Sequence, residues 1–310
     1  MVDLQRLLAR TSRTFALSIP LLEEPPRREV GVAYLLFRIA DTFEDGARWP
    51  RADRLAALSD FGELLRRPDP TRARQKAREW VAARPCDEEF YLELLGQSGE
   101  VLAELEGFPS SRREPIVRHV LRTVEGMAGF VRASDEAGRL QLSGIDDLHG
   151  YCYVVAGIVG ELLTELFLEA APRLREVSPA LAQRAATFGE ALQLVNILKD
   201  SDADARDGRS YLPSRVPRGE VMALARADLK VAGDYVLSLQ QAGAPRGIVE
   251  FTALPVLLAF ATLTQLEKDG PGSKVGRARV AALMGKLRCD VEAGVPVLAI
   301  PAAAEATRPR

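Results

Sequence analysis

The stretch AYLLFRIADTFED at residues 33–45 combines an apolar helical pattern with two regularly spaced acids. Apolar residues at three- and four-residue spacing predict an α-helix that packs against a core. Asp41 and Asp45 are four residues apart, so their carboxylates share one helix face, together with Tyr34 and Arg38 from earlier turns. Like charges at this spacing are unfavourable beside a core unless a cation offsets them. The stretch therefore predicts a helix face that binds cations.

A second stretch, LQLVNILKDSDADARDGRSYLP at residues 192–213, repeats this arrangement. Asn196, Asp200 and Asp204 are each four residues apart, and Gln193 lies one turn before them. Magnesium prefers oxygen ligands and is often held by one or two carboxylates plus substrate phosphates. Two such faces could hold several Mg²⁺ ions around a diphosphate. Basic residues nearby could neutralise the phosphate charge: Arg13, Arg38, Lys199 and Arg209.

The same apolar spacing recurs along the chain, whereas alternating strand patterns are scarce, which predicts an all-α fold. We predict helices at residues 3–18, 27–45, 51–66, 72–84, 87–106, 111–134, 145–172, 179–200, 218–242, 246–268 and 275–293. No linker rich in Gly, Ser or Pro divides the chain. A single domain over residues 1–310, with a core of about 10–293, is the simplest organisation.

Composition restricts the classes of function. The chain has 310 residues, of which 47% are hydrophobic, and a formal net charge of −2. It lacks the broad positive field that binds phosphate polymers, so we expect no nucleic-acid partner. Cys86, Cys152 and Cys289 show no metal-binding spacing and fit a reducing cytoplasm. The apolar stretches near the C-terminus are short and broken by prolines, which predicts at most peripheral membrane contact.

The stretch YCYVVAGIVGELLTELF at residues 151–167 predicts a helix with two interior glycines. Gly157 and Gly160 each cost about 1 kcal/mol relative to alanine, which indicates close approach of another helix or of a ligand. From spacing alone, Tyr151 is best explained as a core tyrosine with a satisfied hydroxyl. His119 and His149 lie outside both acidic stretches, and we expect them at the surface and not as metal ligands.

Four segments together resemble the squalene/phytoene synthase family: TSRTF (11–15), DTFED (41–45), YCYVVAGIVG (151–160) and NILKDSDADARDGRSYLP (196–213). The resemblance spans about residues 10–290 and implies an all-α isoprenoid synthase fold. Its central cavity would be open to diphosphates at one end and apolar toward the other. ALPVLLAFATL (253–263) and GSKVGRARVAALM (272–284) are similar to the reductive half-site of squalene synthases.

The resemblance also implies roles for individual residues. Mg²⁺ and diphosphate would bind Asp41, Glu44, Asp45, Asn196, Asp200 and Asp204. The substrate would contact Ser12, Arg13, Tyr34, Arg38 and Gln193. Tyr151 would lie beside the reacting carbons and assist proton removal. The phosphates of NADPH would face Arg13, Arg38, Lys274 and Arg277.

The activity implied by the resemblance is a Mg²⁺-dependent, head-to-head condensation of two farnesyl diphosphates through presqualene diphosphate, with NADPH reduction to squalene. Three alternatives stay open. A phytoene or dehydrosqualene synthase would use the same acidic helices without hydride, and a terpene cyclase would consume one diphosphate per product. A helical scaffold or metal-dependent binding module would release no diphosphate. The segment around Lys274 and Arg277 could equally be a solvated basic loop.

Overall fold

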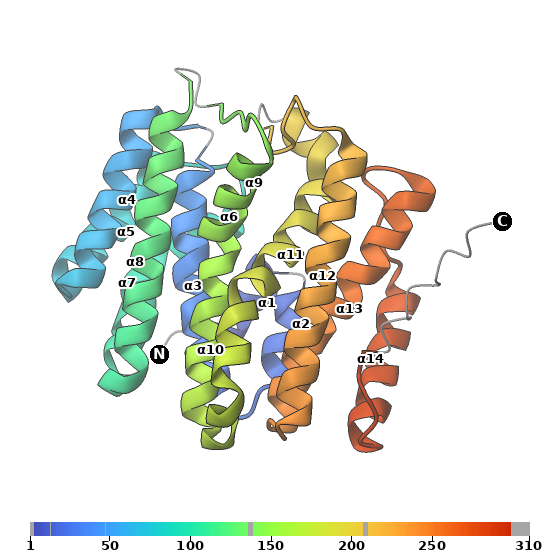
Figure 1. Cartoon of the computed structure of the whole chain (residues 1–310). Coiled ribbons are helices and arrows are strands. Elements are labelled where there is room, and N and C mark those ends of the chain that lie inside the picture. Colours follow the sequence, from blue (N-terminus) through green and yellow to red (C-terminus); the bar gives the residue numbers. More distant parts are fainter. Residues whose placement is uncertain (1–2, 13, 47, 136–138, 207–209, 299–310) are drawn as a thin grey trace.

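Helices packed side by side make up the structure, which is a computed structural model (Figure 1). It describes residues 3–12, 14–46, 48–135, 139–206 and 210–298, with the backbone alone for 203–206. Within these ranges the β contact found is an isolated bridge between Gln141 and Ser210. The predicted all-α fold is confirmed.

The helices follow the predicted order closely. The first half contains α1 (Leu4–Thr11), α2 (Phe15–Ser18), α3 (Pro26–Glu44), α4 (Arg51–Arg66), α5 (Pro70–Ala83), α6 (Glu89–Gly96), α7 (Ser98–Glu106) and α8 (Ser110–Ala133). The second half contains α9 (Ile145–Cys152), α10 (Ile158–Ala170), α11 (Ser178–Arg206), α12 (Arg218–Gln241), α13 (Arg246–Asp269) and α14 (Arg277–Glu292). Short 3-10 helices, η1 (Ile19–Leu21) and η3 (Pro172–Val177), and a π-helical segment, η2 (Tyr153–Gly157), join some of them.

The predicted continuous helix over residues 3–18 is wrong. α1 ends at Thr11, and Ser12 has an extended backbone with φ −137° and ψ 145°. The Ser12 hydroxyl accepts a hydrogen bond of 2.9 Å from the backbone N–H of Phe15. The extended Ser12 therefore ends α1, and α2 begins three residues later at Phe15.

Other helix boundaries also differ from the prediction. The predicted helix at 87–106 divides around Gln97, after Gly96, and the one at 145–172 contains the π segment η2. The predicted helix at 179–200 continues to Arg206, because no glycine or proline lies between Asp200 and Gly208 in the sequence. This extension places the backbone of Asp204 on α11.

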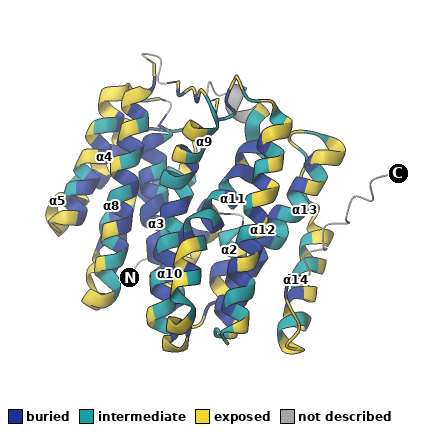
Figure 2. Ribbon diagram, in the orientation of Figure 1, coloured by how far each residue is buried: buried dark blue, intermediate teal, exposed yellow. Residues whose placement is uncertain are grey.

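The C-terminal end of α3 is fixed by aromatic packing. Phe43 is fully buried, and its ring lies 4.7 Å from Trp80, 6.0 Å from Trp49 and 6.1 Å from Phe61, measured between centroids. Buried residues line the interior of the helical layers, and exposed ones cover their outer faces (Figure 2). This packing holds the acidic turn of α3 in a defined position.

Glycines allow α11 to approach α10 and η2 at backbone distance. A Cβ added to Gly160 would lie 1.9 Å from the carbonyl oxygen of Ala185, and one added to Gly189 would lie 2.0 Å from that of Ala156. Real Cβ atoms do not approach backbone oxygens so closely. The predicted close approach at Gly160 is therefore confirmed, and it is made by another helix.

We expect Gly160→Ala to destabilise the protein by about 3 kcal/mol or more, because the new methyl group overlaps a backbone carbonyl that has no rotamer to change. Urea unfolding of the purified variant measures this loss. Gly285→Ala on α14 is the matched control, since nothing lies within 4 Å of a Cβ there. The control should be neutral or slightly stabilising, and equal stability of the two variants would contradict the packing argument.

His119 does not lie at the surface as predicted. Its side chain is 2% exposed, with Nε2 2.9 Å from Glu165 Oε1 and Nδ1 3.0 Å from Arg122 Nη1. These partners on α8 and α10 satisfy both ring nitrogens, which permits burial. The prediction failed because Glu165 is 46 residues away in the sequence.

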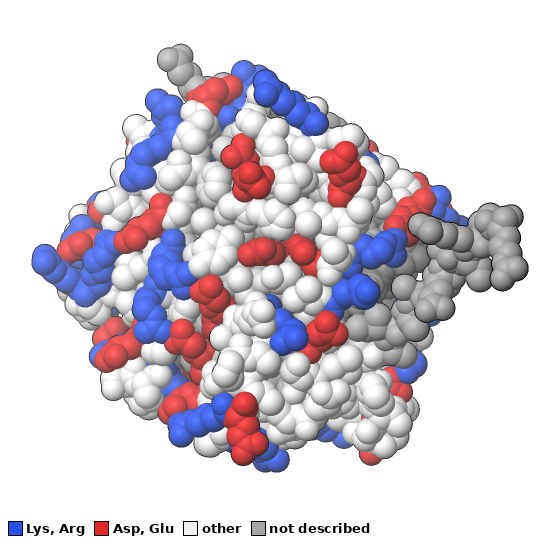
Figure 3. Space-filling model, viewed as in Figure 1, with Lys and Arg blue, Asp and Glu red and all other residues white. Residues whose placement is uncertain are grey.

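Two helical segments are long and apolar enough to cross a membrane by length and composition, Ile145–Ala170 and Arg246–Asp269. More than half of each apolar window is buried inside the fold, as in the core helices of soluble proteins. On the face seen in Figure 3, basic and acidic residues are intermixed. That face offers no broad basic patch to a nucleic acid.

Candidate active site

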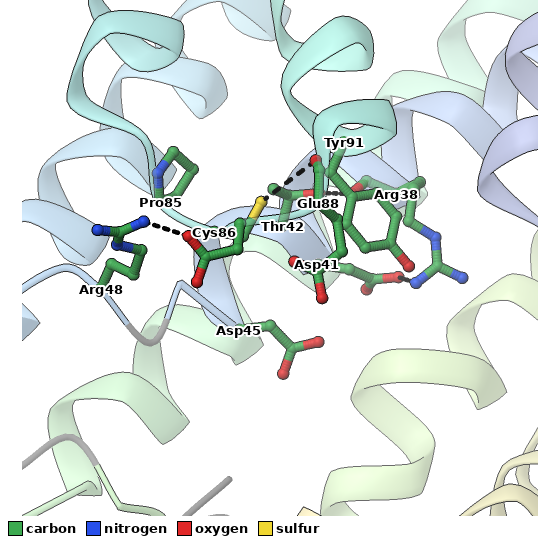
Figure 4. Close-up of a pocket in the computed structure, with 10 residues that line it drawn as sticks. Arg38, Asp41, Thr42, Asp45, Arg48, Pro85, Cys86, Glu88 and Tyr91 are labelled. Carbon is green, nitrogen blue, oxygen red and sulfur yellow. Dashed lines mark hydrogen bonds and ion pairs between the residues drawn. The ribbon is translucent and has the colours of Figure 1, made fainter.

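The first acidic face lies near the C-terminal end of α3. Asp41 and Asp45 line a cavity of about 380 Å³ together with Arg38, Arg48 and Tyr91. The Arg38 guanidinium lies beside Asp41, with Nη1 3.1 Å from Oδ2 (Figure 4). The cation required to offset the paired carboxylates is thus supplied in part by the same helix.

Arg38 keeps its charge in its buried position and has a donor left for an anion. Burial alone would lower its pKa, but the Asp41 carboxylate and the nearby Tyr34 and Tyr91 raise it above the ordinary value. The guanidinium carbon lies 5.6 Å from the Tyr34 ring centroid and 5.9 Å from that of Tyr91. Among the described residues, the buried Nε has no hydrogen-bond partner. A phosphate oxygen would satisfy this donor.

The pKa of Asp41 is raised to about 6, chiefly by burial; Arg38 opposes this shift and Asp45 adds to it. The folded protein therefore disfavours the ionised form of Asp41. A divalent cation between Asp41 and Asp45 would reverse this penalty.

The second acidic face lies on α11. Lys199 Nζ is 3.1 Å from Asn196 Oδ1 and 3.1 Å from Asp200 Oδ2. These three residues line a cavity of about 840 Å³ that is also lined by Ser12, Arg38 and Gln193. Asp204 lies on the same helix, but its side chain is outside the described part, as is all of Arg13.

The two acidic faces meet over one mainly apolar cavity. Asp41 from α3 and Asn196 and Gln193 from α11 line it, with Tyr34 and Arg38. The Tyr34 hydroxyl donates a hydrogen bond of 2.9 Å to the Thr11 carbonyl. The rest of the lining is largely apolar: Phe15, Ile19, Val30, Ala33, Phe37, Val155, Ala156, Val159, Gly160, Leu162, Leu163, Phe188, Gly189, Leu192 and Phe251. The site is polar at one end and apolar at the other, as the resemblance implied.

The donors fit Mg²⁺. Asp41, Asp45, Asn196 and Asp200 offer carboxylate and amide oxygens, which are the ligands that Mg²⁺ prefers. In each face a cationic side chain already lies beside these oxygens, Arg38 on α3 and Lys199 on α11. Each face therefore pairs oxygen donors for a metal ion with a cationic group that could bind phosphate.

Glu44 and Tyr151 do not line these cavities. Tyr151 is 4% exposed, its ring stacks on Tyr211 at 4.7 Å and meets Phe130 edge-on at 5.2 Å. Burial raises the pKa of Tyr151 well above its ordinary value, and the charges of Glu44 and Asp45 add to this. Its hydroxyl is therefore protonated at neutral pH, directly behind the first acidic face.

Tyr211 contacts the first acidic face, and this contact was not predicted from the sequence. Its hydroxyl donates a hydrogen bond of 3.2 Å to Asp45 Oδ1, and its ring stacks on Tyr151. Tyr211 thus links the first acidic face to the buried tyrosine. The available signal was weak: a tyrosine in GRSYLP, directly after the second acidic stretch.

The loop before α14 reaches the second acidic face. The Gly272 N–H donates a hydrogen bond of 3.1 Å to the Lys199 carbonyl, and Gly270 and Gly272 have positive φ angles of 83° and 76°. Lys274 lines the cavity of about 840 Å³, whereas Arg277 is exposed at the start of α14 and does not line it. Of the four predicted contacts for NADPH, Arg38 and Lys274 line this cavity, Arg277 does not, and Arg13 lies outside the described residues.

The sequence profile of the squalene/phytoene synthase family matches residues 8–220, which include both acidic stretches. The chain belongs to the squalene/phytoene synthase family. Squalene synthase of Eremothecium gossypii is 28% identical over 280 residues, which cover 83% of this chain and 60% of that relative. Squalene synthase of Schizosaccharomyces pombe is 27% identical over 284 residues, which cover 85% of this chain and 59% of that relative. The chain thus spans about 60% of the length of these relatives.

Solved structures in this family share the fold. A complex of TcSQS with the ligand E5700 has a TM-score of 0.76 at 24% identity and covers 91% of this chain and 84% of its own. A dehydrosqualene synthase complex has a TM-score of 0.59 at 19% identity, covering 94% and 95%. Squalene synthase HpnC from Alicyclobacillus acidocaldarius has a TM-score of 0.53 at 19% identity, and the match covers 86% of this chain and 92% of that structure. The isoprenoid synthase fold is therefore confirmed.

Proposed function

We propose that this family member condenses two farnesyl diphosphates head to head through presqualene diphosphate, in a reaction that requires Mg²⁺. The observation that carries the proposal is the meeting of two acidic faces, on α3 and α11, over a cavity that is polar at one end and apolar at the other. The family membership and the named squalene synthases support it.

The polar end binds the diphosphates. Asp41, Asp45, Asn196 and Asp200 would hold Mg²⁺, and by family resemblance Glu44 and Asp204 would join them. When bound, the ion would supply positive charge that stabilises the leaving diphosphate. Arg38 and Lys199 bind phosphate oxygens as charged donors. The apolar lining from Ile19 to Phe251 holds the prenyl chain and excludes water from the allylic cation.

Closure of the cyclopropane ring requires loss of a proton. We assign assistance in this step to Tyr151, whose hydroxyl lies near Tyr211, which in turn contacts Asp45. The neutral Tyr151 would take up this proton as its own hydroxyl proton passes to Tyr211, whose proton in turn passes to Asp45.

We further propose that NADPH binds beside the second acidic face and would supply hydride in the second half-reaction. Lys274 supports this assignment, because it lines the larger polar cavity on a loop fixed to Lys199. Arg277 lies outside this cavity but only three residues further on, so it could contact a more distant phosphate of the cofactor.

Charge reversal of the loop, K274E/R277E, should leave presqualene diphosphate formation nearly normal and lower the apparent NADPH affinity about tenfold or more. The reason is that each charge-assisted hydrogen bond contributes about 1.5–3 kcal/mol. Titration of NADPH against squalene output measures the effect. Arg279→Glu, an exposed position two residues beyond Arg277, is the control. If the NADPH dependence is unchanged in the double variant, the loop does not bind NADPH and is only a solvated basic loop.

A dehydrosqualene or phytoene synthase is the second candidate, favoured by the position of Arg277 outside the cavity. The deciding experiment incubates the purified protein with Mg²⁺ and farnesyl or geranylgeranyl diphosphate, with and without NADPH, and identifies the hydrocarbon. A product of two prenyl units and release of diphosphate support the condensation. One diphosphate per product would indicate a cyclase, and no release would overturn the enzymatic proposal.

The product of this reaction is an apolar hydrocarbon, and we propose a cytoplasmic protein with at most peripheral membrane contact. Its two apolar helical segments are mostly buried in the fold, which supports a core position for them.

A further inference from the structure

Three helices bring metal-binding side chains together at a second place in the fold. His149 on α9, Glu190 on α11 and Asp228 on α12 each offer one ligand atom, and these atoms all lie within 4.8 Å of one another. None of the three residues lines the cavities described above. This cluster is therefore separate from the acidic faces.

The spacing within the cluster resembles that of ligands around an ion. His149 Nδ1 is 3.6 Å from Glu190 Oε2, which is longer than an N–H···O hydrogen bond. Tetrahedral ligands at Zn²⁺ distances of about 2.0–2.1 Å lie about 3.3–3.4 Å from each other. The pair is thus close to the separation that two ligands of one Zn²⁺ ion require.

One buried carboxylate oxygen of Asp228 is left without a partner among the described residues. Asp228 Oδ2 is inaccessible to solvent and accepts no hydrogen bond from any described residue. Burial raises the pKa of Asp228 and of Glu190, whereas His149 opposes both shifts. Two carboxylates with a single imidazole are short of positive charge, and a divalent cation would supply it.

The surrounding backbone holds Glu190 in place. Its Oε1 lies 2.9 Å from the position that a Cβ on Gly157 would occupy, so the side chain rests against the π-helical segment η2. The Glu190 side chain is 12% exposed, and that of His149 is 36% exposed. The ligands therefore sit on packed helices, with His149 providing access from solvent.

We propose that His149, Glu190 and Asp228 form a site for a Zn²⁺-class divalent ion, with water as the fourth ligand. An imidazole ligand suits Zn²⁺ or Co²⁺ better than Mg²⁺, which prefers oxygen. The bound ion links α9, the helix that carries Tyr151, to α11 and α12.

The test uses the full-length, tag-free protein carrying Asp41→Asn and Asp200→Asn, so that the acidic faces contribute little binding. In this background we measure Zn²⁺ by calorimetry and Co²⁺ by visible absorption, with millimolar Mg²⁺ present. We expect about one equivalent bound, tetrahedral Co²⁺ absorption, and an affinity at least about tenfold weaker after His149→Ala or Asp228→Asn. Asp234→Asn, an exposed acid on α12, is the matched control and should bind as the parent does.

Absence of stoichiometric Zn²⁺ binding in the parent background would overturn the site, as would equal affinity in the His149→Ala and Asp234→Asn variants. The cluster would then be only a polar contact of His149 with the two carboxylates. No prenyl substrate enters this measurement, so its result is independent of the proposed condensation.

Discussion

Replacement of Asp41 or Asp200 by Asn should lower turnover at least about a hundredfold while the helical fold is retained. Each change removes one charged ligand from an acidic face and leaves a side chain of nearly the same shape. In the proposed reaction this carboxylate would help hold the Mg²⁺ that stabilises the leaving diphosphate, so we expect the effect on kcat and on Mg²⁺ affinity. Steady-state kinetics over a range of Mg²⁺ concentrations measures both.

The fold should survive Asp41→Asn because the carboxylate disfavours its own charge in the metal-free protein. The pKa of Asp41 in the folded protein is about 6, above its ordinary value of 3.8. The neutral Asp41 therefore contributes its full stabilisation of the fold at a pH below 3.8. That stabilisation is lost as the pH rises through about 6. Asn cannot ionise, so the variant does not lose this stability as the pH rises. Its melting temperature at pH 7 without metal should equal or exceed that of the parent.

Asp53→Asn, an exposed acid on α4, is the control for general effects of charge removal and should keep full activity. Parental turnover in soluble, folded Asp41→Asn and Asp200→Asn variants would refute an active site built from the two acidic faces.

Local patterns predicted the helices and both acidic faces, because each depends on residues within a few turns. The spacing of Asp41 and Asp45, and of Asn196 and Asp200, fixes which side chains share a helix face whatever the tertiary packing. Gly160 was likewise predictable, because a costly glycine in an apolar helix indicates a close neighbour.

Features that depend on distant partners could not be predicted. Tyr211 and Asp45 are 166 residues apart, so their hydrogen bond exists only in the folded chain. Burial of His119 likewise depends on Glu165 from another helix. The end of α1 at Ser12 was missed because the flanking apolar spacing favoured one continuous helix.

Tyr151→Phe should leave substrate binding intact and block formation of presqualene diphosphate, with a loss of about a hundredfold or more in the first half-reaction. The ring keeps its stacking on Tyr211 and its edge contact with Phe130, so packing changes little. Rapid-quench analysis of presqualene diphosphate, together with the KM for farnesyl diphosphate, separates the two effects.

Tyr153→Phe is the matched control for Tyr151→Phe. The Tyr153 hydroxyl lies two residues further along and donates to Glu161 at 3.1 Å, away from the cavity lining. A fall in kcat with an unchanged KM in the Tyr151 variant alone means that its hydroxyl acts in the transition state. Normal presqualene diphosphate formation in that variant would instead make Tyr151 a core residue. The contact from Tyr211 to Asp45 would then serve only to orient the acidic face, because no proton would need to leave through it.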